Sequence, residues 1–253
     1  MAEPILRAVG ITRYFSRLTA VDGVDFELLA GEIHAVIGPN GAGKTTLLTT
    51  LAGELTPSAG RIFFADRDIT ALSVEARTLL GIGRTYQRSA VIPGISACAT
   101  VELAAARQVR PAWRLLLPTS RLPDATARAR QALARVGLAG RADDLADVLS
   151  HGERRRLELG AVLVQEPRVV LLDEPLAGLG PDESRDIVTI FEELRKSCAV
   201  MLIEHDVDVV FAVADRITVL DNGRIIASGT PDEVRRSDAV RQAYLGGDAE
   251  SVA

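Results

Sequence analysis

The chain has 253 residues, of which 47% are hydrophobic and 25% charged, so it can bury a large core and is not expected to be disordered. Its formal net charge of -5 argues against a broad basic surface, and we therefore expect no nucleic-acid partner. The two cysteines, Cys98 and Cys198, lie far apart and outside any CxxC pattern. This indicates neither a disulfide framework nor a cysteine zinc site and favours two buried thiols in a reducing compartment.

The first third of the chain predicts two half-buried strands, then an apolar strand that leads through a glycine-rich turn into a helix, and then one more strand. Residues 5–28 alternate loosely between apolar and polar types, which predicts two half-buried strands with the Asp22-Gly23 turn inside the second. Residues 33–37 form an apolar strand that ends at a glycine-rich turn, and a helix is expected over 45–51. A further strand is expected over 61–64.

The middle third and the last third of the chain differ in residue composition and in their pattern of apolar residues. From about residue 89 to residue 165 the chain is rich in Ala, Leu and Arg, and the run 126–138 has strong helix propensity, so we expect a helical subdomain. After it, apolar strands alternate with helices, which predicts a parallel sheet covered on both faces. The expected order is strand 169–172, helix 183–196, strand 199–203, helix 207–214, strand 216–220, an antiparallel hairpin through 224–229 and a short helix from Pro231.

A phosphate-binding loop is predicted at the end of the strand 33–37. The pattern GxxxxGK[ST] is matched by Gly38, Pro39, Asn40, Gly41, Ala42, Gly43, Lys44 and Thr45, followed by Thr46. Backbone N–H groups of 41–45 would cradle the α- and β-phosphates of a nucleotide, while the Lys44 ammonium reaches the β- and γ-phosphates. This loop alone fits kinases, GTPases and many ATPases. Thr45 would bind Mg²⁺. Lys44 is one of only two lysines in the chain, which makes its position informative.

An acidic pair follows the apolar strand 169–172. The carboxyl end of a parallel strand is where ligands bind, so Asp173 would hold Mg²⁺ and Glu174 would polarise the attacking water. The plainer interpretation is an acidic turn, but its pairing with the phosphate loop favours catalysis.

Residues 149–153 (LSHGE), here called the signature segment, introduce a helix. Ser150 and Glu153 also have the spacing of a capping box, and both interpretations can hold at once. With this segment, the chain resembles the ATP-binding cassette (ABC) family, whose signature is typically LSGGQ and precedes the acidic strand. The resemblance implies that Ser150 and Gly152 complete the ATP site of a second cassette subunit.

Further positions match motifs of that family. Gln87 matches the glutamine that senses Mg²⁺ and the attacking water, and His205 matches the histidine that contacts the γ-phosphate. Phe15, or else Tyr14, matches the aromatic residue that stacks on adenine. A core role is the alternative for both His205 and Phe15, and His34 is expected to be structural.

Three positions depart from the common family pattern. His151 and Glu153 stand where Gly and Gln are commonest, and Gly180 stands where many members have Asp. Two alternatives follow from these departures: two copies of this chain form two equally competent sites, or the altered residues reduce the activity of one site.

The resemblance implies an α/β P-loop NTPase fold of the ABC type, with a mostly parallel core sheet, an N-terminal antiparallel β subdomain and an inserted helical subdomain. We expect one ABC ATPase domain over 1–253, with the nucleotide-binding core at about 1–88 and 166–253 and the helical subdomain at about 89–165. Its expected activity is hydrolysis of ATP to ADP and phosphate. The segment WRLLLP, 113–118, fits a satellite hydrophobic cluster or a contact with the permease or bilayer surface.

A closer resemblance, in segments such as GIGRTYQ, LSHGERRRLELG and LIEHDVDVVF, is to the ATPases of branched-chain amino-acid importers. ATPases that power urea, short-chain amide or lipopolysaccharide transport share much of the pattern. The expected partners are a second ABC ATPase subunit, transmembrane permease subunits and a periplasmic or extracellular solute-binding protein. Since the first residues do not resemble a signal peptide and no apolar run approaches about 18 residues, we expect a peripheral protein on the cytoplasmic face of the membrane.

Three other functional classes share some of these motifs. A soluble DNA-repair or chromosome ATPase could use the same cassette but needs a long heptad-bearing insertion, which this sequence lacks. A translation ATPase normally carries two cassettes, and a P-loop kinase has no use for a signature segment.

Overall fold

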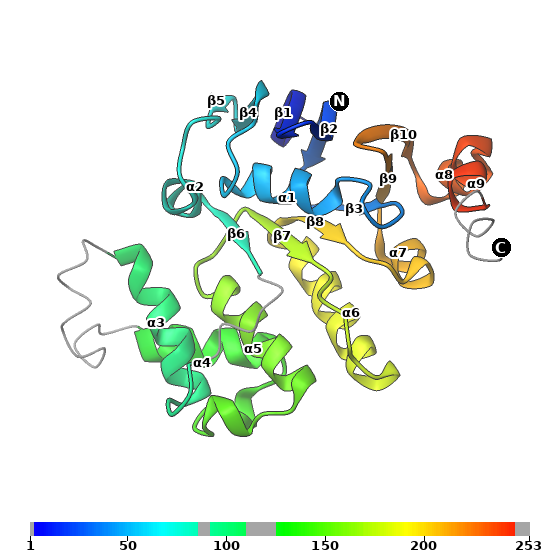
Figure 1. The fold of residues 1–253 in the computed structure, drawn as a ribbon. Coiled ribbons are helices and arrows are strands. Elements are labelled where there is room, and N and C mark those ends of the chain that lie inside the picture. The colour runs from blue at the N-terminus through cyan, green and yellow to red at the C-terminus, as the bar shows by residue number, and fades with distance from the viewer. Residues whose placement is uncertain (1–2, 86–91, 110–124, 246–253) are drawn as a thin grey trace. The chain divides into compact units, whose positions relative to one another are not determined.

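The computed structural model describes residues 3–85, 92–109 and 125–245 (Figure 1). The chain divides into two compact units. The first unit comprises residues 1–82, 168–174 and 191–253, and the second comprises residues 83–167 and 175–190.

The first unit begins with a four-stranded antiparallel sheet in the order β2-β1-β4-β5. Its strands are β1 Pro4–Phe15, β2 Leu18–Leu29, β4 Ala59–Phe64 and β5 Arg67–Asp68. Gly23 lies inside β2 with φ 60°, close to register shifts in its pairing with β1. The predicted Asp22-Gly23 turn is therefore an irregularity within a continuous strand, and the hairpin turns at Ser16 instead.

The second sheet has six strands in the order β10-β9-β3-β8-β7-β6. Its strands are β3 Ile33–Ile37, β6 Ile82–Arg84, β7 Val169–Asp173, β8 Ala199–Ile203, β9 Arg216–Asp221 and β10 Arg224–Gly229. The pairs β9-β3, β3-β8 and β8-β7 are parallel, and β10 pairs antiparallel with β9. The predicted mostly parallel core sheet and the antiparallel N-terminal sheet are thus confirmed.

Helices complete both units. Those of the first unit are α1 Lys44–Ala52, α2 Val74–Leu80, α7 Val207–Val213, α8 Pro231–Arg236 and α9 Asp238–Leu245. Those of the second unit are α3 Ala97–Val109, α4 Ala125–Arg135 and α5 His151–Leu163, with 3₁₀ turns at Ala139–Arg141 and Ala146–Val148. Helix α6, Pro181–Arg195, has residues in both units. No helix among the described residues is long and apolar enough to cross a bilayer.

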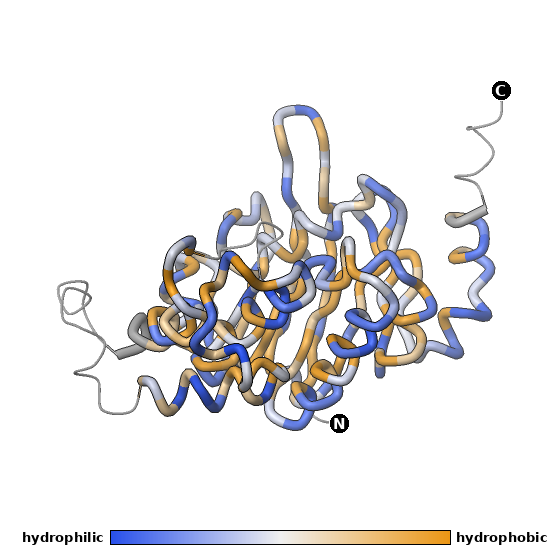
Figure 2. Tube along the Cα trace, turned by 90° about the horizontal axis from the view of Figure 1, so that it is seen from below, coloured by the Kyte–Doolittle hydropathy of each residue, from blue (hydrophilic) through white to orange (hydrophobic). Residues whose placement is uncertain are grey.

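The core of the six-stranded sheet is built from strands without polar alternation. Every residue of β3, β7 and β8 is buried, and the tube in Figure 2 is mainly hydrophobic along these central strands. Such burial on both faces is what a parallel sheet covered by helices requires. Both Cys98 and Cys198 are buried free thiols, as predicted.

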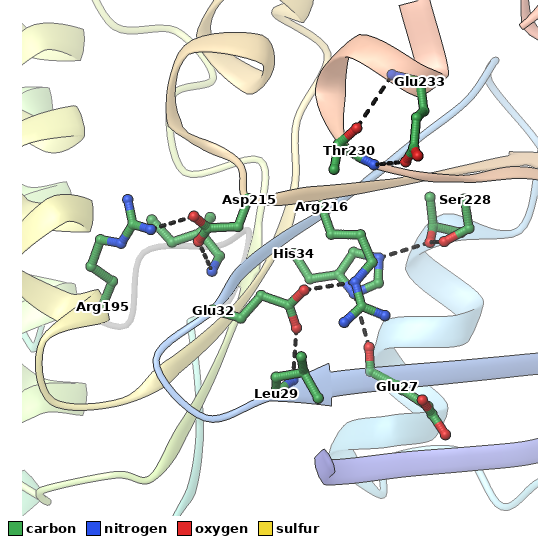
Figure 3. Close-up of polar contacts among 12 residues, drawn as sticks. Glu27, Leu29, Glu32, His34, Arg195, Asp215, Arg216, Ser228, Thr230 and Glu233 are labelled. Atoms are coloured by element: carbon green, nitrogen blue, oxygen red, sulfur yellow. Dashed lines mark hydrogen bonds and ion pairs between the residues drawn. The ribbon is translucent and has the colours of Figure 1, made fainter. Parts of the chain in front are cut away.

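A polar network ties the start of β3 to its neighbours (Figure 3). The Glu32 carboxylate accepts hydrogen bonds from the Leu29 N–H at 2.7 Å and from the Arg216 guanidinium at 2.7 Å. The buried His34 ring contacts the Glu27 carbonyl through Nδ1 at 2.9 Å and the Thr218 hydroxyl through Nε2 at 2.7 Å. The structural role predicted for His34 is confirmed.

Candidate nucleotide-binding site

Two glycines let the loop between β3 and α1 pass close to neighbouring strands. At Gly38, with φ 148°, a Cβ would lie 2.0 Å from the Leu220 carbonyl oxygen. At Gly43, with φ 102°, it would lie 2.3 Å from the Ala20 carbonyl oxygen. A side chain at either position would force backbone atoms apart, so this loop path depends on both glycines.

Lys44 lies at the start of α1 with its ammonium turned back over this loop. Its Nζ donates to the carbonyl oxygens of Gly38 at 2.7 Å and Pro39 at 3.0 Å. Burial lowers the pKa of Lys44, and the negative charges of Glu174 and Asp173 act in the opposite direction. The ammonium is therefore held beside the loop and within the electrostatic field of the acidic pair.

The first turn of α1 presents backbone N–H groups to the loop. Gly43 precedes the helix in a left-handed conformation and provides no side-chain cap, and no acidic residue lies in the first turn. The positive end of a helix without such a cap is suited to an anion such as phosphate. Thr45 places an exposed hydroxyl at the same end, and Thr46 is half-buried beside it.

The acidic pair lies where β7 ends. Asp173 is its last residue and is fully buried. Glu174 follows with φ 48°, a conformation that costs a non-glycine residue energy, and its N–H donates to the Ile203 carbonyl oxygen at 2.9 Å. Strained residues of this kind are often found at functional sites.

His205 meets Glu174 at the same edge of the sheet. It follows β8, and its Nε2 donates to Glu174 Oε1 at 2.6 Å. Its backbone N–H donates to the carboxylate of the buried Glu204 at 3.1 Å. Asp206 then caps α7, its side chain accepting from the Val209 N–H. The predicted His205 and Glu174 side chains are thus in direct contact, just beyond the ends of the adjacent parallel strands β8 and β7.

The donor atoms at this edge fit ATP and Mg²⁺ by their chemistry. Hydroxyl and carboxylate oxygens, as in Thr45 and Asp173, are the ligands that Mg²⁺ prefers. Backbone N–H groups and an ammonium suit phosphate oxygens.

The sequence of the chain is similar to family models and to proteins of known function. Residues 21–177 match the model of the ABC transporter family, and residues 224–250 match the model described as branched-chain amino acid ATP-binding cassette transporter. The high-affinity branched-chain amino acid transport ATP-binding protein LivG of Escherichia coli K12 is 35% identical over 97% of this chain and 99% of that protein.

The chain belongs to the ABC transporter family.

Two further similarities extend this result. The lipopolysaccharide export system ATP-binding protein LptB of Acidithiobacillus ferridurans is 34% identical over 96% of this chain and 97% of that protein. The ADP conformation of MJ1267, an ATP-binding cassette of an ABC transporter, superposes with a TM-score of 0.87 at 29% identity, covering 97% of this chain and all of that one. The fold is that of an ABC cassette, and the chain is an ABC ATPase, an enzyme that hydrolyses ATP.

In this ABC ATPase the signature segment lies in the second unit, at the start of α5. Ser150 is the N-cap residue: its hydroxyl accepts from the Glu153 N–H at 3.1 Å, and its own N–H donates to the Glu153 carboxylate at 2.9 Å. The predicted capping box is confirmed. The Gly152 N–H donates to Glu183 Oε1 at 3.2 Å.

Of two other predicted site residues of this ABC ATPase, Phe15 lies within the part of the chain that the structure describes and Gln87 does not. Phe15, the last residue of β1, is 40% exposed, and the Arg13 guanidinium carbon lies 4.8 Å from the centre of its ring. Gln87 and the segment WRLLLP lie outside the described residues.

Sequence reasoning missed Glu183 and Glu204. Glu183 was expected only as part of a helix, and the one available signal was its place as an acid in the first turn. Glu204 directly precedes His205 in the LIEHD segment. Neither spacing nor residue type indicated which backbone N–H each carboxylate would accept.

Proposed function

We propose that this chain is the ATP-binding and ATP-hydrolysing subunit of a membrane importer for branched-chain amino acids or a similar small solute. The observation that carries the proposal is the match of residues 224–250 to the branched-chain transporter model, in a chain whose phosphate loop and acidic pair have the geometry described above. LivG, named as a branched-chain amino acid transport protein, supports the same substrate class.

In this proposal, the triphosphate of ATP lies along the loop 38–46, with Phe15 against the adenine. The Lys44 ammonium exchanges its loop carbonyl partners for the β- and γ-phosphate oxygens. Glu174 takes the proton of the attacking water, and His205 both orients Glu174 and contacts the γ-phosphate.

Thr45 and Asp173 would hold Mg²⁺, with Gln87 as a further ligand. Mg²⁺ supplies charge neutralisation of the phosphate oxygens. The protein contributes the buried position of Asp173 at the end of β7, which fixes one carboxylate close to Lys44.

A second cassette, identical or paralogous, completes each site. Its Ser150 and Gly152 would approach the γ-phosphate with the positive end of α5. Transmembrane permease subunits and a periplasmic or extracellular solute-binding protein complete the transporter, and the chain lies at the cytoplasmic face of the membrane. Within it, the helical subdomain at about 89–165 is the proposed insert in the nucleotide-binding core.

The similarity to LptB supports a second candidate, an ATPase that powers lipopolysaccharide export, and a urea or amide transporter uses related chemistry. A soluble ABC ATPase without a permease is the candidate from another class.

One experiment tests both substrate and mechanism. Cells that lack the gene are expected to lose uptake of labelled leucine, isoleucine and valine, and the wild-type gene restores it. The variant Glu174→Gln is expected to fail in restoring uptake, because it hydrolyses ATP about 10²- to 10⁴-fold more slowly while it still binds ATP. Glu192→Gln, an exposed charge removal on α6, is the matched control and restores uptake.

Unchanged amino-acid uptake together with loss of surface lipopolysaccharide would support the export candidate instead. Unchanged ATP turnover in Glu174→Gln would remove Glu174 from its proposed role.

A further inference from the structure

The N-terminus of α5 is occupied by two carboxylates of the chain itself. Glu153 closes the capping box with Ser150. The second is Glu183 of α6, whose Oε1 accepts from the Gly152 N–H at 3.2 Å. Thus a helix end that would face a phosphate in the proposed transporter already faces negative charge.

Glu183 is packed closely against Gly152. A Cβ at Gly152 would lie 2.4 Å from Glu183 Oε1 and 2.6 Å from its carboxyl carbon. The other oxygen, Oε2, accepts from the Gly180 N–H at 3.3 Å. One carboxylate therefore joins the signature segment to the loop that precedes α6.

Other contacts hold the same loop and helix α6 against α5. His151 Nε2 lies 3.4 Å from the Ala177 carbonyl oxygen, and the buried Arg155 donates through Nε to the Pro175 carbonyl oxygen at 3.1 Å. Arg156 forms an ion pair with Asp186 at 3.2 Å. Because these contacts fix the backbone without Glu183, the carboxylate can leave Gly152 while the loop stays in place.

We propose that Glu183 competes with the γ-phosphate of the partner's ATP for the Gly152 N–H and so raises the ATP concentration that pairing of two cassettes requires. The inference rests on the proposed function, in which Gly152 meets that phosphate. Two anions cannot share one N–H without strong repulsion, so Glu183 must turn away as the phosphate arrives. Glu183 is thus a residue that sets the threshold for closure and takes no part in bond breaking.

The competition is tested by pairing in the Glu174→Gln protein, which retains bound ATP. Sedimentation velocity is recorded over a titration of ATP with MgCl₂, with and without the second change Glu183→Gln. The half-maximal ATP concentration is expected to fall about 2- to 30-fold with Glu183→Gln, the range expected for one charge at a helix end. Glu192→Gln, which removes the same charge from the same helix, is expected to leave it unchanged.

A lower half-maximal ATP concentration means that pairing has become easier, which a substitution that merely disrupts the fold would not produce. An unchanged or higher requirement with Glu183→Gln would overturn the proposal, and a higher one would make Glu183 a positioning residue for α5.

Amide spectra of the nucleotide-free protein separate this proposal from the proposed function. In ¹⁵N-labelled protein, Glu183→Gln is expected to shift the resonances of both Gly152 and Gly180, and Glu192→Gln neither. If they do not shift, the contact is absent and the competition is refuted. If they shift but Glu174→Gln forms no pairs at any ATP concentration, with or without Glu183→Gln, pairing by this chain alone is refuted, and with it the competition as proposed.

Discussion

His34 is a titratable residue that the fold keeps neutral. Burial, then the positive charge of Arg216, lowers its pKa from 6.5 to about 3, and the hydrogen bond to the Glu27 carbonyl only partly opposes this. Since Nδ1 donates to that carbonyl, Nε2 accepts from the Thr218 hydroxyl, an arrangement that only the neutral ring can make. A proton on Nε2 would remove that acceptor.

This predicts that the chain loses stability as the pH falls below 6.5. Between pH 6.5 and 3 the unfolded chain binds a proton at His34 and the folded chain does not, so stability rises with pH in this window. The contribution is about 1.4 kcal/mol per pH unit between roughly pH 6 and pH 4. Urea unfolding at pH 7, 6 and 5 measures it, and His34→Gln should flatten the slope, whereas replacement of the exposed His151 by Gln should not. Equal slopes in all three proteins would contradict the assignment.

The role of a residue was predictable from sequence where the spacing of a motif fits only one kind of binding site. The loop from Gly38 to Thr45 is such a case, because a phosphate cradle requires glycines, lysine and hydroxyl in that order. Partners far apart in sequence were not predictable. Glu183 is 31 residues from Gly152, and only the folded loop brings its carboxylate to that N–H.

At the scale of elements, α1 is held at its C-terminal end by a buried arginine of α2. The Arg77 guanidinium donates to the carbonyl oxygens of Thr50 at 2.9 Å and Leu51 at 2.7 Å, and also to those of Leu72 and Thr70. Burial lowers its pKa to about 10, so it stays charged at neutral pH. It supplies a donor to the Leu51 carbonyl at the end of α1 and a second donor to Thr50, whose carbonyl also accepts from the Gly53 N–H at 3.2 Å.

Replacement of this side chain should therefore destabilise the first unit. Arg77→Met removes a buried donor from four carbonyl groups, of which Thr50 keeps the Gly53 N–H, and is expected to lower the free energy of unfolding by about 3 kcal/mol or more. Arg67→Met, at an exposed position in β5, should change it by less than about 0.5 kcal/mol. Chemical denaturation at pH 7 measures both, and similar small losses in the two variants would show that Arg77 is dispensable.

The elements themselves were largely predictable. The apolar runs at 33–37, 169–172 and 199–203 became β3, β7 and β8, because burial on both faces leaves a continuous hydrophobic signal. The short strands β5 and β6 and the helix α2 were missed, since two to seven residues carry too little periodicity to stand out. Glu153, which stands where Gln is commonest in the family pattern, closes the capping box with Ser150, a role that glutamate and glutamine can both fill.

At the scale of the whole molecule, the proposed machinery is divided between the two units. The first unit carries Lys44, Asp173, Glu174 and His205, and the second carries Ser150 and Gly152. The residue types and their spacing do not by themselves indicate which copy of the chain supplies each half; the resemblance of the signature segment to that of the ABC family does. The central claim of this account is that the second half comes from another cassette.

The most direct measurement is a crystal structure of the Glu174→Gln protein with ATP and Mg²⁺, alone or with a paralogous partner cassette. The account predicts two cassettes around each ATP, with the triphosphate on the loop around Lys44 of one chain and the Ser150 hydroxyl or its counterpart on the γ-phosphate from the other. A single protomer that encloses the γ-phosphate with its own groups alone would contradict it.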